Sequence, residues 1–228
     1  MQKEFNDNFK YEHIKAIIFD FDKTLYFSKD LDDYYTKFIK DTIVKLGGYN
    51  EEEALKIMEE YGFIGDKKRP SFAKTCCNFG ISKESWDAYR IENFFEFDYE
   101  NADVVSNATL QRLAQKYPLF LVSNEVKKNL ITKANKLNIE LSHFSNIFAP
   151  DATEIDTYPT KKEIYKLIGD NLNLTYNSLF AIGDRLLVDV QPLLELGGSG
   201  IIITHPDQIN EICDEIIKKS TNDKEVLY

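Results

Sequence analysis

Short apolar runs without polar alternation recur along the chain, and most are followed by a segment with helical spacing. Such runs are typical of strands that are buried on both faces of a parallel sheet. They predict strands at 14–20, 119–122, 146–149, 179–182 and 201–203. Helical spacing predicts helices at 108–116, 126–137, 160–171, 188–196 and 208–219. The alternation predicts an α/β fold, a Rossmann-like parallel sheet with helices on both faces.

Residues 26–100 interrupt this alternation with segments that have almost only helical spacing. Apolar residues recur at that spacing from Leu31 to Ile43 and stop at Gly47-Gly48, a helix C-cap signal. Asn50 is followed by three glutamates, which favour the start of another helix. Further helices are expected at 70–79 and 82–95. We therefore expect a core of residues 1–25 and 101–228, with an all-helical insert, or cap, at 26–100.

Composition narrows the classes of partner. The chain has 228 residues, 43% of them hydrophobic, which is enough for a sizeable core. The formal net charge of −10 disfavours wide binding to nucleic acid or to an anionic membrane. The three cysteines have no zinc-binding spacing, and no apolar run is long enough to span a bilayer. We expect a soluble cytoplasmic protein with no nucleic-acid or membrane partner, and a polar lead-in at residues 1–13.

Polar side chains follow several of the predicted strands. Asp20 and Asp22 follow the first strand, Ser123 and Asn124 follow the second, and Asp184 follows a later one. The carboxyl ends of parallel strands lie at one edge of the sheet, so these groups can converge. An aspartate pair at a strand end can also be simple turn or capping chemistry. A hydroxyl, an amide and several carboxylates favour an oxyanion that is bridged to a cation, with Mg²⁺ as the expected metal.

These motifs resemble those of the haloacid dehalogenase superfamily. The first motif is Asp20-Phe21-Asp22-Lys23-Thr24, and the second is Ser123 at a strand end. A later motif is Gly183-Asp184, with Asp189 five residues beyond Asp184. The motifs stand in the expected order after the expected strands, and the resemblance covers most of the chain.

The resemblance implies a role for each of these residues. Asp20 would be the nucleophile and Asp22 the general acid and base. Mg²⁺ would be held by side-chain oxygens of Asp20 and Asp184 and by the backbone carbonyl of Asp22, and Asp189 would hold a metal-bound water or steady the site. Leaving-group charge and burial would keep Asp22 protonated, while the metal keeps Asp20 ionised. The phosphate would be bound by Thr24, Ser123, Asn124 and a lysine.

The sequence around that lysine departs from the family pattern. In many members of the family a proline directly follows the lysine. Here Tyr158 precedes Pro159, and Lys161 and Lys162 follow one turn later. We favour Lys161. The alternative is that both lysines are solvated surface residues.

The resemblance implies a Mg²⁺-dependent phosphatase that hydrolyses a small phosphorylated metabolite through an aspartyl-phosphate. Thr24-Leu25-Tyr26 and the helical insert are similar to a pyrimidine 5′-nucleotidase-like or phosphoglycolate-phosphatase-like branch. Two alternatives stay open: a phosphomutase with the same phospho-aspartate, and a non-catalytic regulatory or binding protein on this fold. A dehalogenase is disfavoured because those members lack the second aspartate, whereas Asp22 is present.

Overall fold

The computed structural model describes residues 2–4, 11–64, 72–93, 99–151 and 157–222. The chain divides into two compact units. One is an α/β unit of Met1–Phe27 and Ala102–Tyr228, and the other is a helical unit of Ser28–Asn101. Among the described residues, no helix is both long enough and apolar enough to cross a membrane.

The α/β unit is built on a six-stranded sheet in the order β1-β8-β7-β2-β5-β6. Five of these strands are parallel, with β2 between β5 and β7. The parallel strands are β2 Ala16–Phe19, β5 Leu119–Val122, β6 Asn146–Phe148, β7 Leu179–Gly183 and β8 Ser199–Ile202. The predicted α/β fold class is therefore confirmed, and the strand bounds differ from prediction only at their ends.

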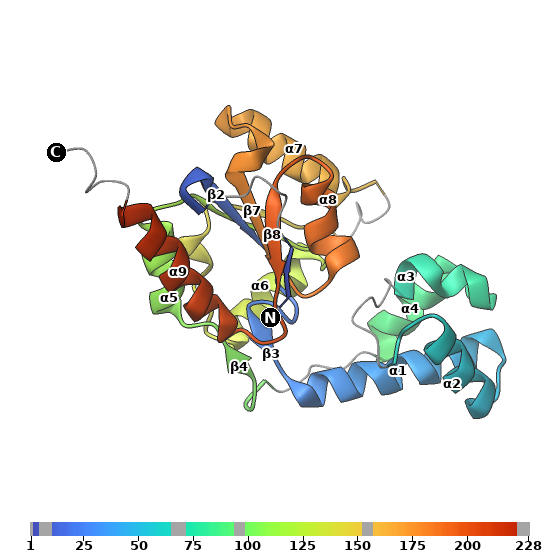
Figure 1. Cartoon of the computed structure of the whole chain (residues 1–228). Helices are drawn as coiled ribbons and strands as arrows, with labels where there is room; N and C mark the ends of the chain where they lie inside the picture. The colour runs from blue at the N-terminus through green and yellow to red at the C-terminus, as the bar shows by residue number, and fades with distance from the viewer. Residues whose placement is uncertain (1, 5–10, 65–71, 94–98, 152–156, 223–228) are drawn as a thin grey trace. The chain divides into compact units, whose positions relative to one another are not determined.

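Helices cover both faces of this sheet. The helices of the α/β unit are α5 Asn107–Ala114, α6 Lys127–Lys136, α7 Lys161–Leu172, α8 Gln191–Leu194 and α9 Gln208–Asn222. Figure 1 shows α7 and α8 on one side of the sheet and α5 and α9 on the other. Ala16 and Ile18 of β2 pack into one buried cluster with Ile164 and Ile168 of α7. Burial on both faces explains the continuous apolar runs in the sequence.

The structure corrects the sequence-based prediction in three places of the α/β unit. Gln2–Glu4, predicted to be part of a lead-in, forms β1, antiparallel to β8. Strands β3 Tyr26–Phe27 and β4 Asp103–Val104, which were not predicted, pair with each other. The predicted helix at 188–196 is instead a π-helix at Leu186–Val190 followed by α8. Two- and three-residue strands and a π-turn are too short or too irregular to produce a periodic pattern.

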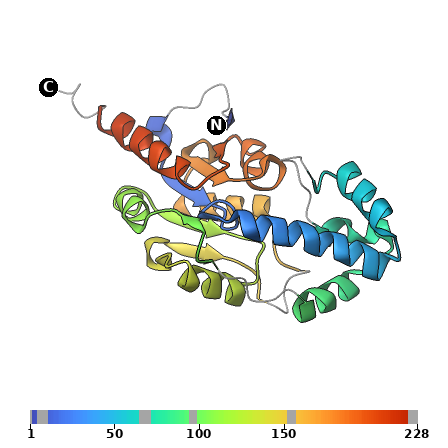
Figure 2. The ribbon, with the colours of Figure 1, turned by 90° about the horizontal axis from the view of Figure 1, so that it is seen from below.

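The helical unit begins with the long helix α1, Lys29–Gly47, which is light blue in Figure 2. Gly48 ends α1 in the left-handed conformation, and Asn50 forms a capping box at the start of α2, Glu51–Glu60, as expected. The predicted helix at 70–79 is α3 Phe72–Thr75 followed by a 3₁₀ turn, and residues 70–71 lie outside the described residues. The predicted helix at 82–95 is α4 Lys83–Asn93, and 94–95 are likewise outside them.

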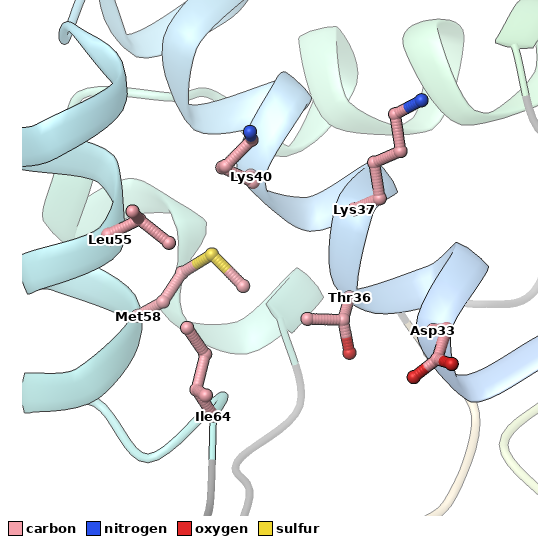
Figure 3. A pocket seen from close by; sticks show the side chains of 7 residues that line it. All are labelled: Asp33, Thr36, Lys37, Lys40, Leu55, Met58 and Ile64. Carbon is pink, nitrogen blue, oxygen red and sulfur yellow. The ribbon is translucent and has the colours of Figure 1, made fainter. Parts of the chain in front are cut away.

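Aromatic side chains fill the core of the helical unit. Trp86 packs against Phe38 and Phe72, with ring centroids 5.6 and 4.7 Å away. Figure 3 shows a shallow pocket beside this core, between α1 and α2. Its lining side chains come from α1, α2 and the segment after α2, and none is a predicted site residue. All the predicted site residues lie in the α/β unit.

Candidate active site

The first motif forms a tight turn at the carboxyl end of the central strand β2. The backbone N–H of Asp20 still donates to Ile182 of β7, at 3.0 Å. The chain then leaves the sheet, and Thr24 and Leu25 both donate to the carbonyl of Phe21. Phe21 is fully buried and anchors the turn, while Lys23 takes a positive φ of 61°. The two aspartates of the motif are thus fixed by the central strand and a short turn.

A buried lysine joins two of the predicted carboxylates. The Lys161 Nζ lies 2.6 Å from Asp20 Oδ1 and 2.7 Å from Asp189 Oδ1. All three side chains are almost fully buried. Burial disfavours the ammonium form of Lys161, but the two aspartates outweigh it and raise the lysine pKa. Lys161 is therefore a permanent positive charge inside the cluster.

The N-terminus of α7 decides which of the two lysines enters the site. Thr160 caps α7 and forms a capping box with Glu163, so Lys161 is the first helical residue. Lys162 instead extends to Glu195, with 2.6 Å between Nζ and Oε2, and is partly exposed. The structure thus places Lys161, and not Lys162, beside Asp20.

Asp189 is held by contacts on all sides. Its Oδ2 accepts the backbone N–H of Arg185 at 2.9 Å, and its backbone carbonyl accepts the Tyr165 hydroxyl at 2.8 Å. Burial would raise the pKa of Asp189, but Lys161 and Arg185 outweigh it, so the pKa is lowered. The π-helix that carries Asp189 brings this carboxylate back under Gly183. Asp189 is therefore a fixed anion.

Asp20, Asp184 and Asp189 form the acidic cluster of the site. One carboxylate oxygen from each lies within 4.8 Å of the others. Asp184 Oδ1 is buried with no hydrogen-bond partner among the described residues, and Arg185 Nε is 3.7 Å away. Burial and the neighbouring aspartates raise the pKa of Asp184 well above its usual range and that of Asp20 to about 6. An unsatisfied buried oxygen within a crowd of carboxylates fits a bound cation.

Asp22 has a separate environment. Its Oδ1 accepts the Tyr26 hydroxyl at 2.5 Å and the Lys133 Nζ at 2.9 Å. Burial would raise the pKa of Asp22, but Lys133 and these hydrogen bonds outweigh it, so the pKa is lowered. The side chain is 39% exposed, compared with 5% for Asp20. Asp22 is the more accessible of the two motif carboxylates.

The other predicted site residues, Ser123, Asn124 and Thr24, have fewer defined contacts than the aspartates and Lys161. Ser123 is buried at the end of β5, and its Oγ accepts the N–H of Glu125 at 3.1 Å; among the described residues its hydroxyl hydrogen has no acceptor. Asn124 is exposed. Thr24 was expected to bind the phosphate, and its Oγ1 is buried with no hydrogen-bond partner in the described part of the chain. Its backbone N–H donates to Phe21 and shapes the turn.

Sequence reasoning missed Lys133 and Glu125. Lys133 Nζ lies 2.9 Å from Glu125 Oε2 as well as from Asp22. The detectable signal was the four-residue spacing of Glu125, Asn129 and Lys133, which aligns Glu125, just before α6, with one face of that helix. Only the fold shows that this face meets Asp22.

Known proteins share this fold. Among solved structures, a haloacid dehalogenase-like hydrolase from Streptococcus pneumoniae is 20% identical, with a TM-score of 0.57, and covers 84% of this chain and 85% of its own. A haloacid dehalogenase-type phosphatase from Thermococcus onnurineus is 18% identical, with a TM-score of 0.51, and covers 83% of this chain and 86% of its own. A hydrolase of this class from Bacillus subtilis, solved with magnesium bound, is 14% identical, with a TM-score of 0.51, and covers 88% of this chain and 99% of its own.

At these identities the structural likeness shows the fold alone. No curated protein sequence matches the chain. The family model for haloacid dehalogenase-like hydrolases matches residues 14–197, which include both aspartates of the first motif, Ser123, Lys161, Asp184 and Asp189. This match covers most of the chain, and the chain belongs to the haloacid dehalogenase-like hydrolases.

Proposed function

We propose that this hydrolase is a Mg²⁺-dependent phosphatase that cleaves small phosphomonoesters through an aspartyl-phosphate. The observation that carries the proposal is the cluster of Asp20, Asp184 and Asp189, in which the Lys161 ammonium contacts Asp20 and Asp189. The three carboxylates outnumber the two neighbouring cations, Lys161 and Arg185, so one negative charge is left unbalanced. A cation satisfies that charge and leaves a place for a phosphate dianion.

The metal would be held by side-chain oxygens of Asp20 and Asp184 and by the backbone carbonyl of Asp22. The unsatisfied Oδ1 of Asp184 supports this assignment. Asp189, whose two oxygens already accept from Lys161 and Arg185, would steady the cluster or hold a metal-bound water. When bound, Mg²⁺ would supply the positive charge that lets a phosphate approach a carboxylate. The magnesium in the Bacillus subtilis relative agrees with this choice of ion.

The reaction would proceed in two steps. An oxygen of Asp20 forms a bond to phosphorus while the bond from phosphorus to the leaving oxygen breaks, and Asp22 gives that oxygen its proton. A water would then attack the phosphorus of the aspartyl-phosphate and lose a proton to Asp22, while the bond from phosphorus to the Asp20 oxygen breaks and frees the Asp20 carboxylate. The products are the alcohol and inorganic phosphate, and both aspartates return to their starting states.

The charges of Asp20 and Asp22 must suit these roles. From the sequence we expected an ionised Asp20 and a protonated Asp22. The protein's own groups shift the pKa values in the opposite directions, since that of Asp20 is raised to about 6 and that of Asp22 is lowered. A cation beside Asp20 lowers the pKa of Asp20, and a phosphate dianion beside Asp22 raises the pKa of Asp22. Substrate and metal would therefore establish the protonation states that the reaction needs.

Lys161 and Ser123 would stabilise the transferring phosphoryl group. Lys161 is a buried cation 2.6 Å from Asp20, and the Ser123 hydroxyl can still donate a hydrogen bond. The position of Lys161 supports catalysis over a binding role on an inactive fold. Asn124 and Thr24 are proposed to complete the phosphate site.

The helical unit is proposed to act as a cap that selects the substrate. It follows the nucleophile turn directly in sequence, as caps do in the branches that the chain resembles. A cap that excludes water favours nucleoside monophosphates and short phosphorylated acids or sugars over phosphoproteins. We propose a pyrimidine 5′-nucleotidase-like or phosphoglycolate-phosphatase-like substrate.

Phosphate release from p-nitrophenyl phosphate tests the reaction. The purified protein should release phosphate with Mg²⁺, stop in EDTA and recover when Mg²⁺ is added back. Unchanged activity in EDTA would overturn the metal, and no release from any phosphomonoester would overturn the reaction. A panel of metabolites, phosphopeptides and a 5′-phosphorylated oligonucleotide tests the substrate class, and a macromolecule as best substrate by kcat/KM would overturn it.

A further inference from the structure

Lys133 bridges two segments of the α/β unit that lie far apart in sequence. Its ammonium is 2.9 Å from Asp22 Oδ1 in the first motif and 2.9 Å from Glu125 Oε2, two residues after Ser123. The side chains of Lys133 and Glu125 are 15% and 13% exposed, so water screens the contact between these two weakly. The bridge therefore links the two loops that carry the acid and the phosphate ligand.

The start of α6 holds Glu125 in place for this bridge. Oε1 of Glu125 accepts the backbone N–H of Val126 at 2.9 Å and the side-chain amide of Asn129 at 3.2 Å. Its other carboxylate oxygen is thereby turned to Lys133, two turns along the helix. The glutamate backbone N–H also donates to Ser123. Glu125, which lies beside the proposed phosphate ligand Ser123, therefore holds the Lys133 side chain in the position from which it contacts Asp22.

We infer that Lys133 is a positioning residue for Asp22, which it holds in the orientation needed to protonate the leaving group. The inference rests on the phosphatase function proposed above. Both hydrogen bonds that Asp22 accepts within the described residues end on Oδ1, from Tyr26 and from Lys133. Oδ2 is then the oxygen that delivers the proton.

The ammonium also has an electrostatic part in this step. As the bond from phosphorus to the leaving oxygen breaks and the bond to Asp20 forms, the proton moves from Asp22 Oδ2 to the departing oxygen. Asp22 is left as a carboxylate, and the charge of Lys133 is already 2.9 Å away. No reorganisation is needed at that moment, which is how fixed charges lower a barrier. A purely structural ion pair would give no such advantage to one step.

Leaving groups of different basicity separate these two cases. An alkoxide needs a proton as it departs, whereas 2,4-dinitrophenolate is a stable anion that departs without one. For both esters, kcat/KM covers the steps up to transfer of the phosphoryl group to Asp20, so hydrolysis of the aspartyl-phosphate does not enter. The ratio of the two values therefore measures proton donation by Asp22.

The experiment compares the full-length wild type with Lys133→Met and Lys133→Arg on propyl phosphate and 2,4-dinitrophenyl phosphate. Lys136→Met, an exposed lysine near the end of the same helix, is the matched control. We expect Lys133→Met to lower kcat/KM about 30-fold or more for propyl phosphate and less than about 3-fold for the dinitrophenyl ester, as general acid catalysis is worth about 10²–10⁴-fold. Lys133→Arg should keep most of the activity on both esters, and Lys136→Met should change neither.

Equal losses on both esters, or no loss on either, would overturn the inference. If Lys133→Met does not fold, Lys133→Gln, which keeps an N–H donor without the charge, is compared on the same two esters. A wild-type protein that releases no phosphate from either ester overturns the proposed function instead. That result is distinct from an active enzyme in which the Lys133 substitutions change kcat/KM equally for both esters.

Discussion

Gly183 and Asp189 pack so closely that a side chain at Gly183 has no room. A β-carbon there would lie 2.3 Å from Asp189 Cβ and 2.9 Å from its Oδ2. The π-helix returns Asp189 to the end of β7, where only glycine allows this approach. The glycine that precedes Asp184 therefore sets the position of the carboxylate that holds Lys161.

Gly183→Ala should lower both stability and activity. The clash cannot be relieved by a flexible chain end, because Cβ of Asp189 is attached directly to the backbone of a buried residue, so we expect a loss of about 1–3 kcal/mol in unfolding free energy. Displacement of Asp189 should also disturb Lys161 and reduce kcat. Urea unfolding and phosphate release measure the two effects. In an Asp189→Gly background the substitution should cost less stability, and an equal cost in both backgrounds would contradict the clash.

Asp20→Asn should abolish turnover while the fold persists. The substitution removes the proposed nucleophile, and the loss should reach several orders of magnitude because the residues of such a site act as a unit. It also relieves repulsion with Asp189 and Asp184, so the melting temperature of the variant should not fall much. Calorimetry alongside phosphate release checks both. Activity within about tenfold of wild type would exclude Asp20 as nucleophile.

Lys161→Met and Lys162→Met form a matched pair of neighbouring substitutions. The first leaves Asp20 and Asp189 buried without their cation, at a cost of about 3–5 kcal/mol in stability, and should reduce kcat at least a hundredfold. The second breaks a partly exposed pair with Glu195 and should change either quantity little. Unfolding and kinetic measurements on both variants make the comparison. Equal small effects would show that Lys161 does not supply the balancing charge.

Asp184→Asn should stabilise the metal-free protein near neutral pH. The folded-state pKa of Asp184 is raised by burial and by Asp189 and Asp20, so the folded protein binds more protons than the unfolded chain above about pH 4. Stability then falls as pH rises through that window, and Asp20, with a pKa of about 6, acts in the same direction. The lowered pKa values of Asp22 and Asp189 act only at more acidic pH.

Melting temperatures in EDTA check this sign. Wild type should melt higher at about pH 5 than at about pH 7.5, and Asp184→Asn should melt higher than wild type at the upper pH by a few degrees, as about 1 kcal/mol shifts Tm by about 2–4 °C in a chain of this size. Mg²⁺ should raise the Tm of wild type and not that of the variant. A variant that melts lower than wild type in EDTA at the upper pH would contradict the prediction.

The sheet was predictable because its strands are buried on both faces. Ile17 and Phe19 are fully buried, as are their neighbours on β7, so the apolar runs mark the strands directly. Because the carboxyl ends of parallel strands lie at one edge of a sheet, the sequence alone places Asp20 and Asp184 at the same edge. The two-residue strands β3 and β4 were missed because so short a segment has no period.

The bridge from Lys133 to Asp22 could not be predicted in the same way. The two residues are 111 positions apart, and their contact depends on how α6 packs beside the turn after β2. The choice between Lys161 and Lys162 depends only on which of these two adjacent residues faces the site at the start of the helix. The capping box of Thr160 with Glu163 fixes that start, and its spacing was already visible in the sequence.

The pairing of β3 with β4 has a consequence for how the chain can be divided. Tyr26 lies opposite Val104 and Phe27 opposite Asp103, so the chain leaves the α/β unit and re-enters it through adjacent antiparallel strands. The ends of the helical unit are therefore as close as the two sides of a hairpin. A two-residue turn of the Asn-Gly type can join such strands without changing their register. In evolutionary terms, the helical unit occupies the place of a hairpin loop, where segments can be lengthened, shortened or exchanged while the sheet and its acidic cluster are inherited unchanged.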